Sequence, residues 1–178
     1  MLNQDNIKKA WFFAANAHKK EFYPSSNLPY LVHLGDVAFE IFGVRESLKD
    51  FELALTCAIL HDVIEDTSTT YEDIKDEFGK SVADGVLALT KDKSLPKSKQ
   101  LIDSLQRILQ QPFEIGAVKM ADRICNLSTP PKHWDSQKIK EYAKEAELIY
   151  DYLYHTNSAL ATRLKRKIQN YYKNYVKD

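Results

Sequence analysis

The chain has 178 residues, which is enough for one domain with a buried core and too few for two domains of ordinary size. Its 25 basic and 25 acidic side chains balance, so it lacks the excess positive charge typical of nucleic-acid-binding proteins. Two cysteines without CxxC spacing argue against a disulfide scaffold or a thiolate zinc site. The sequence has no signal-peptide core and no membrane-length apolar run, so we expect a cytoplasmic protein that binds neither nucleic acid nor membrane.

Helical periodicity recurs along the chain, whereas strand-like alternation is scarce. A polar loop is expected at Tyr23–Asn27, and breaks are expected at Gly43, at Gly79 and at Thr129-Pro130-Pro131. The predicted helices cover residues 5–20, 30–42, 51–61, 71–78, 81–89, 101–109, 112–127, 138–154 and 159–175. We therefore predict an all-α protein in which residues 1–178 form one domain of about eight to ten helices, with a C-terminal helix in 156–178.

The most apolar predicted helix, Phe51 to Leu60, ends at the polar run His61-Asp62-Val63-Ile64-Glu65-Asp66-Thr67. Charged groups at the end of a buried helix are costly unless they are paired or bound to a metal. If the helix continues, Asp62, Glu65 and Asp66 share one of its faces, because they are spaced i, i+3, i+4. A bound cation would relieve their mutual repulsion. The alternative interpretation is an acidic helix end that lies in solvent.

Two residues elsewhere in the chain are further candidates for a metal site. His33 lies on the second predicted helix, where a hydrogen-bonded core histidine is the alternative. Asp122 lies within an apolar helix, where an ion pair with Lys119 or Arg123 is the alternative. Together with His61 and Asp62 they would form a nitrogen and oxygen ligand set suited to Mn2+, Fe2+, Co2+ or Zn2+. The motifs HExxH, GxxxxGK[ST] and GxGxxG are absent from the sequence.

The segments PYLVH, LHDVIEDT, LTKDKSLPK and VKMADRICNL occur in this order along the chain. They resemble the (p)ppGpp hydrolase branch of the HD superfamily, which includes the SpoT/Rel hydrolase domain and small single-domain hydrolases of the Mesh1 type. The resemblance covers about residues 5–150. It implies a helical HD fold and a metal-dependent (p)ppGpp 3′-pyrophosphohydrolase, usually with Mn2+. The chain has no room for a synthetase domain, so we expect a hydrolase only.

The resemblance also implies roles for individual residues. The metal ligands would be His33, His61, Asp62 and Asp122, and the catalytic acidic pair would be Glu65 and Asp66. Asn126 and Tyr142 match residues that contact the nucleotide, and Lys138 stands where relatives commonly carry an arginine, so it would meet phosphate as a point charge. The remaining candidates to neutralise phosphate charge are Lys119 and Arg123, with ion-paired scaffold roles as the alternative.

The sequence departs from this family pattern in one place. Relatives carry an arginine shortly before the PYxxH motif, whereas residues 19–27 (KKEFYPSSN) contain none. This difference favours, as a second hypothesis, a nucleotidase or phosphodiesterase that acts on another phosphorylated nucleotide. A third hypothesis is a non-catalytic module that senses nucleotides, and the presence of Glu65 and Asp66 argues against it. The expected partner is a small phosphorylated nucleotide, and Tyr171, Tyr172 and Tyr175 are candidates either for packing or for a homodimer contact.

Overall fold

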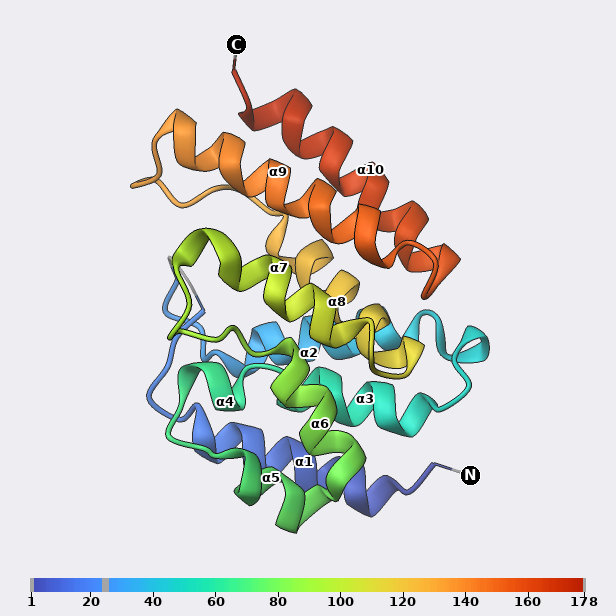
Figure 1. Ribbon diagram of the computed structural model, residues 1–178. Coiled ribbons are helices and arrows are strands. Elements are labelled where there is room, and N and C mark those ends of the chain that lie inside the picture. The colour runs from blue at the N-terminus through green and yellow to red at the C-terminus, as the bar shows by residue number, and fades with distance from the viewer. Residues whose placement is uncertain (1, 24–25, 178) are drawn as a thin grey trace.

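The computed structural model describes residues 2–23 and 26–177, so residues 24 and 25 of the predicted loop lie outside the described residues, as do 1 and 178. The described chain is helical apart from loops and one isolated bridge between Phe22 and Pro29 (Figure 1). The elements are α1 (Gln4–Ala17), α2 (Leu31–Phe42), the 3-10 turn η1 (Arg45–Ser47), α3 (Phe51–Leu60), α4 (Val63–Asp66), α5 (Tyr71–Phe78), α6 (Lys80–Leu89), α7 (Lys97–Ile108), α8 (Phe113–Asn126), α9 (Ser136–Leu153) and α10 (Ser158–Tyr175). The predicted all-α class is confirmed.

Capping side chains set several of the helix boundaries. The Asp50 side chain accepts a hydrogen bond from the Leu53 amide at the start of α3. At α5, Thr70 and Asp73 form a capping box in which each side chain accepts from the other residue's amide. Gly79, at a φ of 85°, separates α5 from α6 in a conformation that glycine adopts readily.

Two predicted helix boundaries were wrong. The first helix ends at Ala17 and not near Lys20, because the chain turns after His18, where the Glu21 amide donates to the His18 carbonyl. Helix α7 begins at Lys97, directly after Pro96, and not at Leu101 as predicted. Its first turn is polar and mostly exposed, so hydrophobic periodicity could not mark it.

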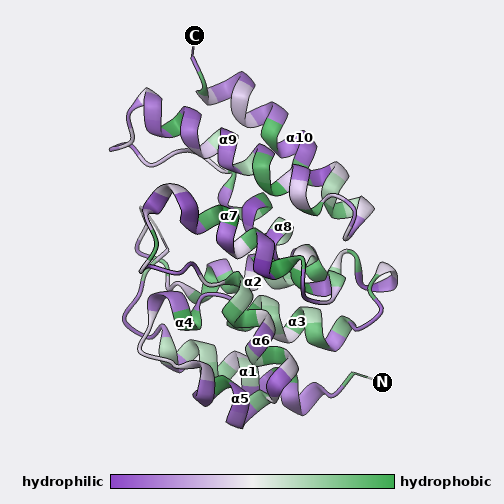
Figure 2. Cartoon of the chain, viewed as in Figure 1, coloured by the Kyte–Doolittle hydropathy of each residue, from purple (hydrophilic) through white to green (hydrophobic). Residues whose placement is uncertain are grey.

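Helices α3 and α8 form the centre of the molecule. Helix α3 contacts α1, α2, α6 and α8, and α8 also contacts α2, α9 and α10. Every residue from Leu53 to Leu60 is buried, as is every residue from Glu114 to Ile124. Figure 2 shows α3 largely in the hydrophobic colour, whereas hydrophilic and hydrophobic colours alternate along α9 and α10. The two central helices therefore provide a rigid base for side chains that project from them.

The C-terminal tyrosines mostly pack against the chain itself. Tyr171 is only 2 % exposed, and its ring lies 6.2 Å from that of Tyr142. The Tyr172 hydroxyl donates to Glu147. Tyr171 therefore follows the packing interpretation, and a homodimer stays a prediction. Among the helices that the structure describes, none is both long and apolar enough to cross a membrane.

Gly116 on α8 lies close to Thr156 in the connection between α9 and α10, and this contact leads to a stability prediction. A Cβ atom there would lie 2.6 Å from Cγ2 of Thr156 and 3.0 Å from its Cβ, so a β-branched side chain would have to move. Gly116→Ala should lower the free energy of unfolding by roughly 1 kcal/mol, because overpacking costs about 1–3 kcal/mol and the better helix propensity of alanine returns at most about 1 kcal/mol. Urea denaturation measures this change.

Gly35→Ala is the matched control, because its Cβ would meet Trp11 at an ordinary 3.6 Å. That variant should gain up to about 1 kcal/mol from helix propensity. Equal stability of the two variants would contradict the proposed close packing at Gly116.

Candidate active site

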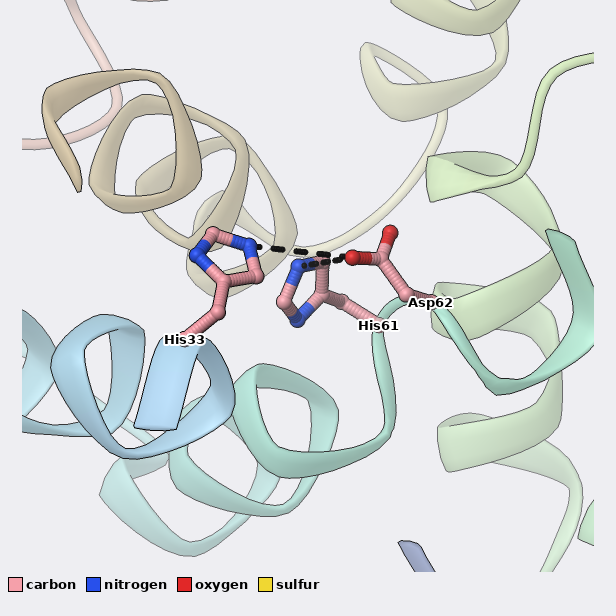
Figure 3. A group of neighbouring side chains, drawn as sticks. All are labelled: His33, His61 and Asp62. Atoms are coloured by element: carbon pink, nitrogen blue, oxygen red, sulfur yellow. Dashed lines mark ion pairs between the residues drawn. The ribbon is translucent and has the colours of Figure 1, made fainter. Parts of the chain in front are cut away.

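Side chains from three parts of the chain meet where α2, α3 and α8 come together. Nε2 of His33 lies 3.7 Å from Oδ2 of Asp62 and 3.5 Å from Oδ1 of Asp122. Nε2 of His61 lies 2.9 Å and 3.9 Å from the same two oxygens. Figure 3 shows both imidazoles facing the Asp62 carboxylate. The structure therefore brings together all four residues that the sequence singled out as candidate ligands.

A break in the helix lets the neighbours His61 and Asp62 face each other. Adjacent residues on one helix diverge by roughly 100°. Here α3 ends at Leu60, and a separate short helix, α4, begins at Val63 after a turn formed by His61 and Asp62. The buried helix therefore does not continue through the acidic residues. Asp62, Glu65 and Asp66 do not share a face of α3, as they would have done if it had continued.

The hydrogen bonding of the two imidazoles fits a metal site. Nδ1 of His61 lies 2.8 Å from the Ala58 carbonyl and donates to it, which leaves Nε2 directed at the carboxylates. Nε2 is buried and lies 2.9 Å from Oδ2 of Asp62, but without the alignment of a regular hydrogen bond. Metal-bound histidines typically donate their other ring nitrogen to a carbonyl or carboxylate in this way. Atoms of His33, His61 and Asp62 lie within 4.8 Å of one another, as ligands of one ion require.

The electrostatics of the cluster favour a positive charge among the carboxylates. Burial lowers the pKa of His61, but the charges of Asp62 and Asp122 outweigh it and raise the pKa to about 9. Burial raises the pKa of each aspartate, yet His61 beside Asp62 and Lys119 beside Asp122 bring both pKa values below the ordinary range. Either a proton on His61 or a divalent cation supplies the compensating charge, so we expect metal binding to release a proton.

Further hydrogen bonds hold the two aspartates. Nζ of Lys119 donates to Oδ2 of Asp122 at 3.0 Å, and the Asn126 amide donates to Oδ1. The Tyr30 hydroxyl donates to Oδ2 of Asp62 at 2.5 Å. Burial and the Asp62 charge raise the pKa of Tyr30, so this hydroxyl keeps its proton. For Lys119 the structure favours the ion-paired interpretation, although Lys119 still lines the cleft described below.

Glu65 and Asp66 have different environments. The Glu65 carboxylate accepts from the Lys91 amide at 3.0 Å and from Lys91 Nζ at 3.2 Å, while Lys93 Nζ donates to the Glu65 carbonyl. No hydrogen bond or ion pair from the described residues reaches the Asp66 carboxylate. Asp66 is exposed in part, yet its partial burial, followed by the charges of Asp62 and Glu65, raises its pKa to about 6. One carboxylate is therefore anchored, and the other is free to exchange a proton near neutral pH.

A cleft of about 360 Å³ opens directly onto this cluster. The predicted substrate contacts Asn126, Lys138, Tyr142, Lys119 and Arg123 all line it, together with Asp62, Glu65, Asp66 and Asp122. Its remaining lining residues include Tyr30, Lys91, Lys97, Gln100, Trp134 and Glu145. The lining of the cleft therefore combines the acidic groups of the candidate metal site with several basic side chains.

Arg123 is the most unusual basic group of the cleft. It is 5 % exposed, and its Nε and Nη1 have no hydrogen-bond partner among the described residues. Nη2 reaches Glu145 at 3.4 Å, and the guanidinium lies 4.1 Å from the ring centre of Tyr142. Buried donors without partners are rare in native structures, so this arrangement suits an anionic ligand.

A second cavity, of about 570 Å³, adjoins the cleft. The two share Asn126, Trp134 and Tyr142. The Trp134 and Tyr142 rings lie 5.0 Å apart, and Tyr23, Pro130 and Pro131 add to an apolar wall. A ligand with a charged part and a flat apolar part could therefore occupy both spaces at once.

The lining residues that were not predicted from the sequence include three with polar groups at the site: Tyr30, Lys91 and Lys97. All three lie inside the segments PYLVH and LTKDKSLPK, so a signal was present. Which side chain of each segment points into the cleft depends on the fold of the loops before α2 and α7, which local periodicity does not determine.

Comparison with known proteins places the chain in a family. The HD domain family matches residues 10–158. This chain belongs to the HD domain family. It is 32 % identical over 159 residues to a protein of Danio rerio named guanosine-3′,5′-bis(diphosphate) 3′-pyrophosphohydrolase MESH1, covering 86 % of this chain and 87 % of that one. It is 35 % identical over 163 residues to the bifunctional (p)ppGpp synthase/hydrolase SpoT of Escherichia coli, which covers 86 % of this chain but only 22 % of that protein.

Solved structures support the HD fold. The structure of a metazoan ortholog of SpoT, described as hydrolyzing ppGpp, matches with a TM-score of 0.82 at 28 % identity over 93 % of this chain and 94 % of that one. A protein of Listeria monocytogenes matches with a TM-score of 0.66 at 22 % identity over 83 % of this chain, which supports the fold alone. The resemblance and the helical HD fold predicted from the sequence are confirmed.

The raised pKa of Asp66 leads to a prediction for the metal-free HD domain. A carboxyl whose pKa is higher in the folded state than in the unfolded state favours folding while protonated, and that contribution is lost as the pH rises through the folded pKa of about 6. Asp66→Asn should therefore be more stable than the parent protein at about pH 8 and equally stable at about pH 3. Urea denaturation in chelator at several pH values measures the difference.

Asp84→Asn is a control of opposite sign. The pKa of Asp84 is lowered by hydrogen bonds from Lys80 and Tyr71, so ionised Asp84 stabilises the fold. Its replacement should be destabilising as the pH rises. A stability difference for Asp66→Asn that does not change with pH would show that this carboxyl has an ordinary pKa.

Proposed function

We propose that this chain is a metal-dependent phosphohydrolase that releases pyrophosphate from the ribose 3′ position of (p)ppGpp. The observation that carries the proposal is the cleft itself, whose lining combines Asp62 and Asp122 of the candidate metal cluster with the basic groups Lys97, Arg123 and Lys138. Its relatives named as (p)ppGpp hydrolases match along most of the chain. We also propose that residues 1–178 act as one unit, because α9 contributes Lys138 and Tyr142 to the cleft.

His33, His61, Asp62 and Asp122 are the proposed ligands, and Mn2+ is the proposed ion. When bound, such an ion polarises a phosphoryl oxygen and lowers the pKa of its bound water toward neutrality. The ligands come from α2, from the end of α3 and from α8, so the protein core fixes their positions.

Glu65 and Asp66 are the proposed catalytic carboxylates. The Asp66 carboxylate lines the cleft and has no hydrogen bond or ion pair with the described residues, so we propose that it accepts a proton from the attacking water. Glu65, held by Lys91, orients that water. Attack on the phosphorus attached to the 3′ oxygen breaks that P–O bond, and the 3′ oxygen takes up a proton as pyrophosphate leaves.

The basic groups of the cleft are proposed to bind the phosphates. Arg123 offers two donor nitrogens, Nε and Nη1, that have no partner among the described residues, and its ring contact with Tyr142 holds the guanidinium in place. Lys97 and Lys138 line the same cleft, and Lys138 lies 5.6 Å from the ring centre of Trp134. Lys97 and Lys138 are proposed to neutralise phosphate charge beside Arg123.

The adjoining cavity is the proposed site for the guanosine side of the substrate. The described residues between α1 and α2 contribute Tyr23, Ser26 and Leu28 to its wall, and none of them is an arginine. The base is therefore proposed to be held by aromatic and apolar contacts with Tyr142, Trp134 and Tyr23.

The direct test is to incubate purified protein with Mn2+ and ppGpp and to measure pyrophosphate release. We expect release by the parent protein and a loss of about 100-fold or more in kcat for Glu65→Gln, in line with the usual contribution of a positioned acid or base. Glu72→Gln, on the exposed surface of α5, is the control and should keep full activity. Absence of pyrophosphate release by metal-loaded parent protein would refute the assignment.

The missing arginine supports a second candidate, a nucleotidase or phosphodiesterase with the same metal site. A panel of phosphorylated nucleotides distinguishes the two candidates: turnover of another nucleotide, without turnover of ppGpp, would favour this one. Tight nucleotide binding without any turnover would favour the non-catalytic sensor.

A further inference from the structure

The Tyr30 hydroxyl contacts the oxygen of Asp62 that faces the imidazoles. It donates to Oδ2 at 2.5 Å, and the same oxygen lies 2.9 Å from Nε2 of His61 and 3.7 Å from Nε2 of His33. Tyr30 is the residue directly before α2, and Asp62 lies between α3 and α4. This single hydrogen bond therefore joins two separate segments at the metal site.

Asp62 has a competing position available to its side chain. It is the N-cap residue of α4, where aspartate normally accepts a hydrogen bond from an amide of the first helical turn. In this structure its side chain makes no such capping bond. The carboxylate faces the imidazoles instead, and the Tyr30 hydroxyl is the donor that holds it there. Asp122 needs no comparable help from another segment, because Lys119 and Asn126 of its own helix bind it.

The Tyr30 ring is itself held in place by the chain between α1 and α2. It stacks on the His18 ring at 4.9 Å with an angle of 30° between the planes. His18 is 3 % exposed, and its Nδ1 lies 2.8 Å from the Glu21 carboxylate. The Tyr30 amide also donates to the Glu21 carbonyl at 3.0 Å. The segment that lacks the arginine of its relatives therefore provides a support for Tyr30.

We propose that Tyr30 is a positioning residue of the metal site, which keeps the Asp62 carboxylate turned toward His33 and His61 and away from the N-cap of α4. This inference rests on the proposed metal site but not on the identity of the substrate. Without the hydroxyl, the carboxylate can rotate toward the amides in the first turn of α4, and the ion then loses a well-oriented oxygen ligand. Tyr30→Phe keeps the ring and its contact with His18, so it removes only this constraint.

The experiment measures metal binding in the absence of nucleotide. The full chain, stripped with chelator, is titrated with Co2+, which binds nitrogen and oxygen sites more tightly than Mn2+ and whose visible absorption reports its coordination. We expect Tyr30→Phe to weaken Co2+ binding by about 10–100-fold, the usual effect of removing a group that orients a metal ligand. Its Co2+ absorption spectrum should also change, which a purely structural role of Tyr30 would not cause.

Tyr71→Phe is the matched control, because it removes a tyrosine hydroxyl that donates to Asp84 at 2.8 Å and lines neither cavity of the site. It should leave both the affinity and the spectrum unchanged. Thermal unfolding of each metal-free variant checks that the fold is retained. Co2+ affinity and spectrum equal to those of the parent in Tyr30→Phe would overturn the proposal, as would a parent protein that binds no Co2+. A different outcome is possible: the parent protein binds Co2+, Tyr30→Phe binds it more weakly, and the parent does not hydrolyse ppGpp. That result would refute the proposed substrate and support the role of Tyr30.

Discussion

The burial of two carboxylates and two imidazoles in one place is the constraint on which the rest of this structure depends. His33, His61 and Asp122 are each less than a tenth exposed, and Asp62 completes the group. Placing like charges together in the interior costs several kcal/mol per ion unless a counter-charge is present. The surrounding bonds to the Ala58 carbonyl, to Lys119 and to Tyr30 orient these groups but leave their facing atoms directed at one another. The proposed cation would supply this counter-charge to all four groups, which are positioned by α2, the end of α3 and α8.

The site combines rigid and loop-borne parts. The candidate ligands come from α2, the end of α3 and α8, and α8 also carries Arg123 and Asn126. The other groups that would meet the substrate come from α4, from the segment around the start of α7 and from α9. Two of these parts hold each other, because Lys91 in the loop before α7 binds the Glu65 carboxylate of α4 at two points. Changes in the loops can therefore alter which nucleotide fits while the ligand cluster stays the same, as the absence of arginine before α2 suggests.

Much of this arrangement was predictable from the sequence, and the limits have physical causes. The periodic apolar residues predicted the helices, and the motifs around His33, His61-Asp62 and Asp122 indicated the HD family and the cluster now proposed as the ligand set. The end of α3 near His61 was predicted, but the short helix α4 was not, because four residues are too few to show a helical period. The roles of His18, Tyr30 and Lys91 depend on which segments meet in three dimensions, and no local pattern encodes that.

The most direct test of the central claim, that these four side chains hold one divalent ion, is diffraction from Mn2+-soaked crystals at the manganese absorption edge. The account predicts one anomalous peak at roughly 2.2 Å from Nε2 of His33, from Nε2 of His61 and from a carboxylate oxygen of each of Asp62 and Asp122. A peak bound elsewhere, for example only by Glu65 and Asp66, would contradict it, as would the absence of any peak in crystals that contain Mn2+ in excess.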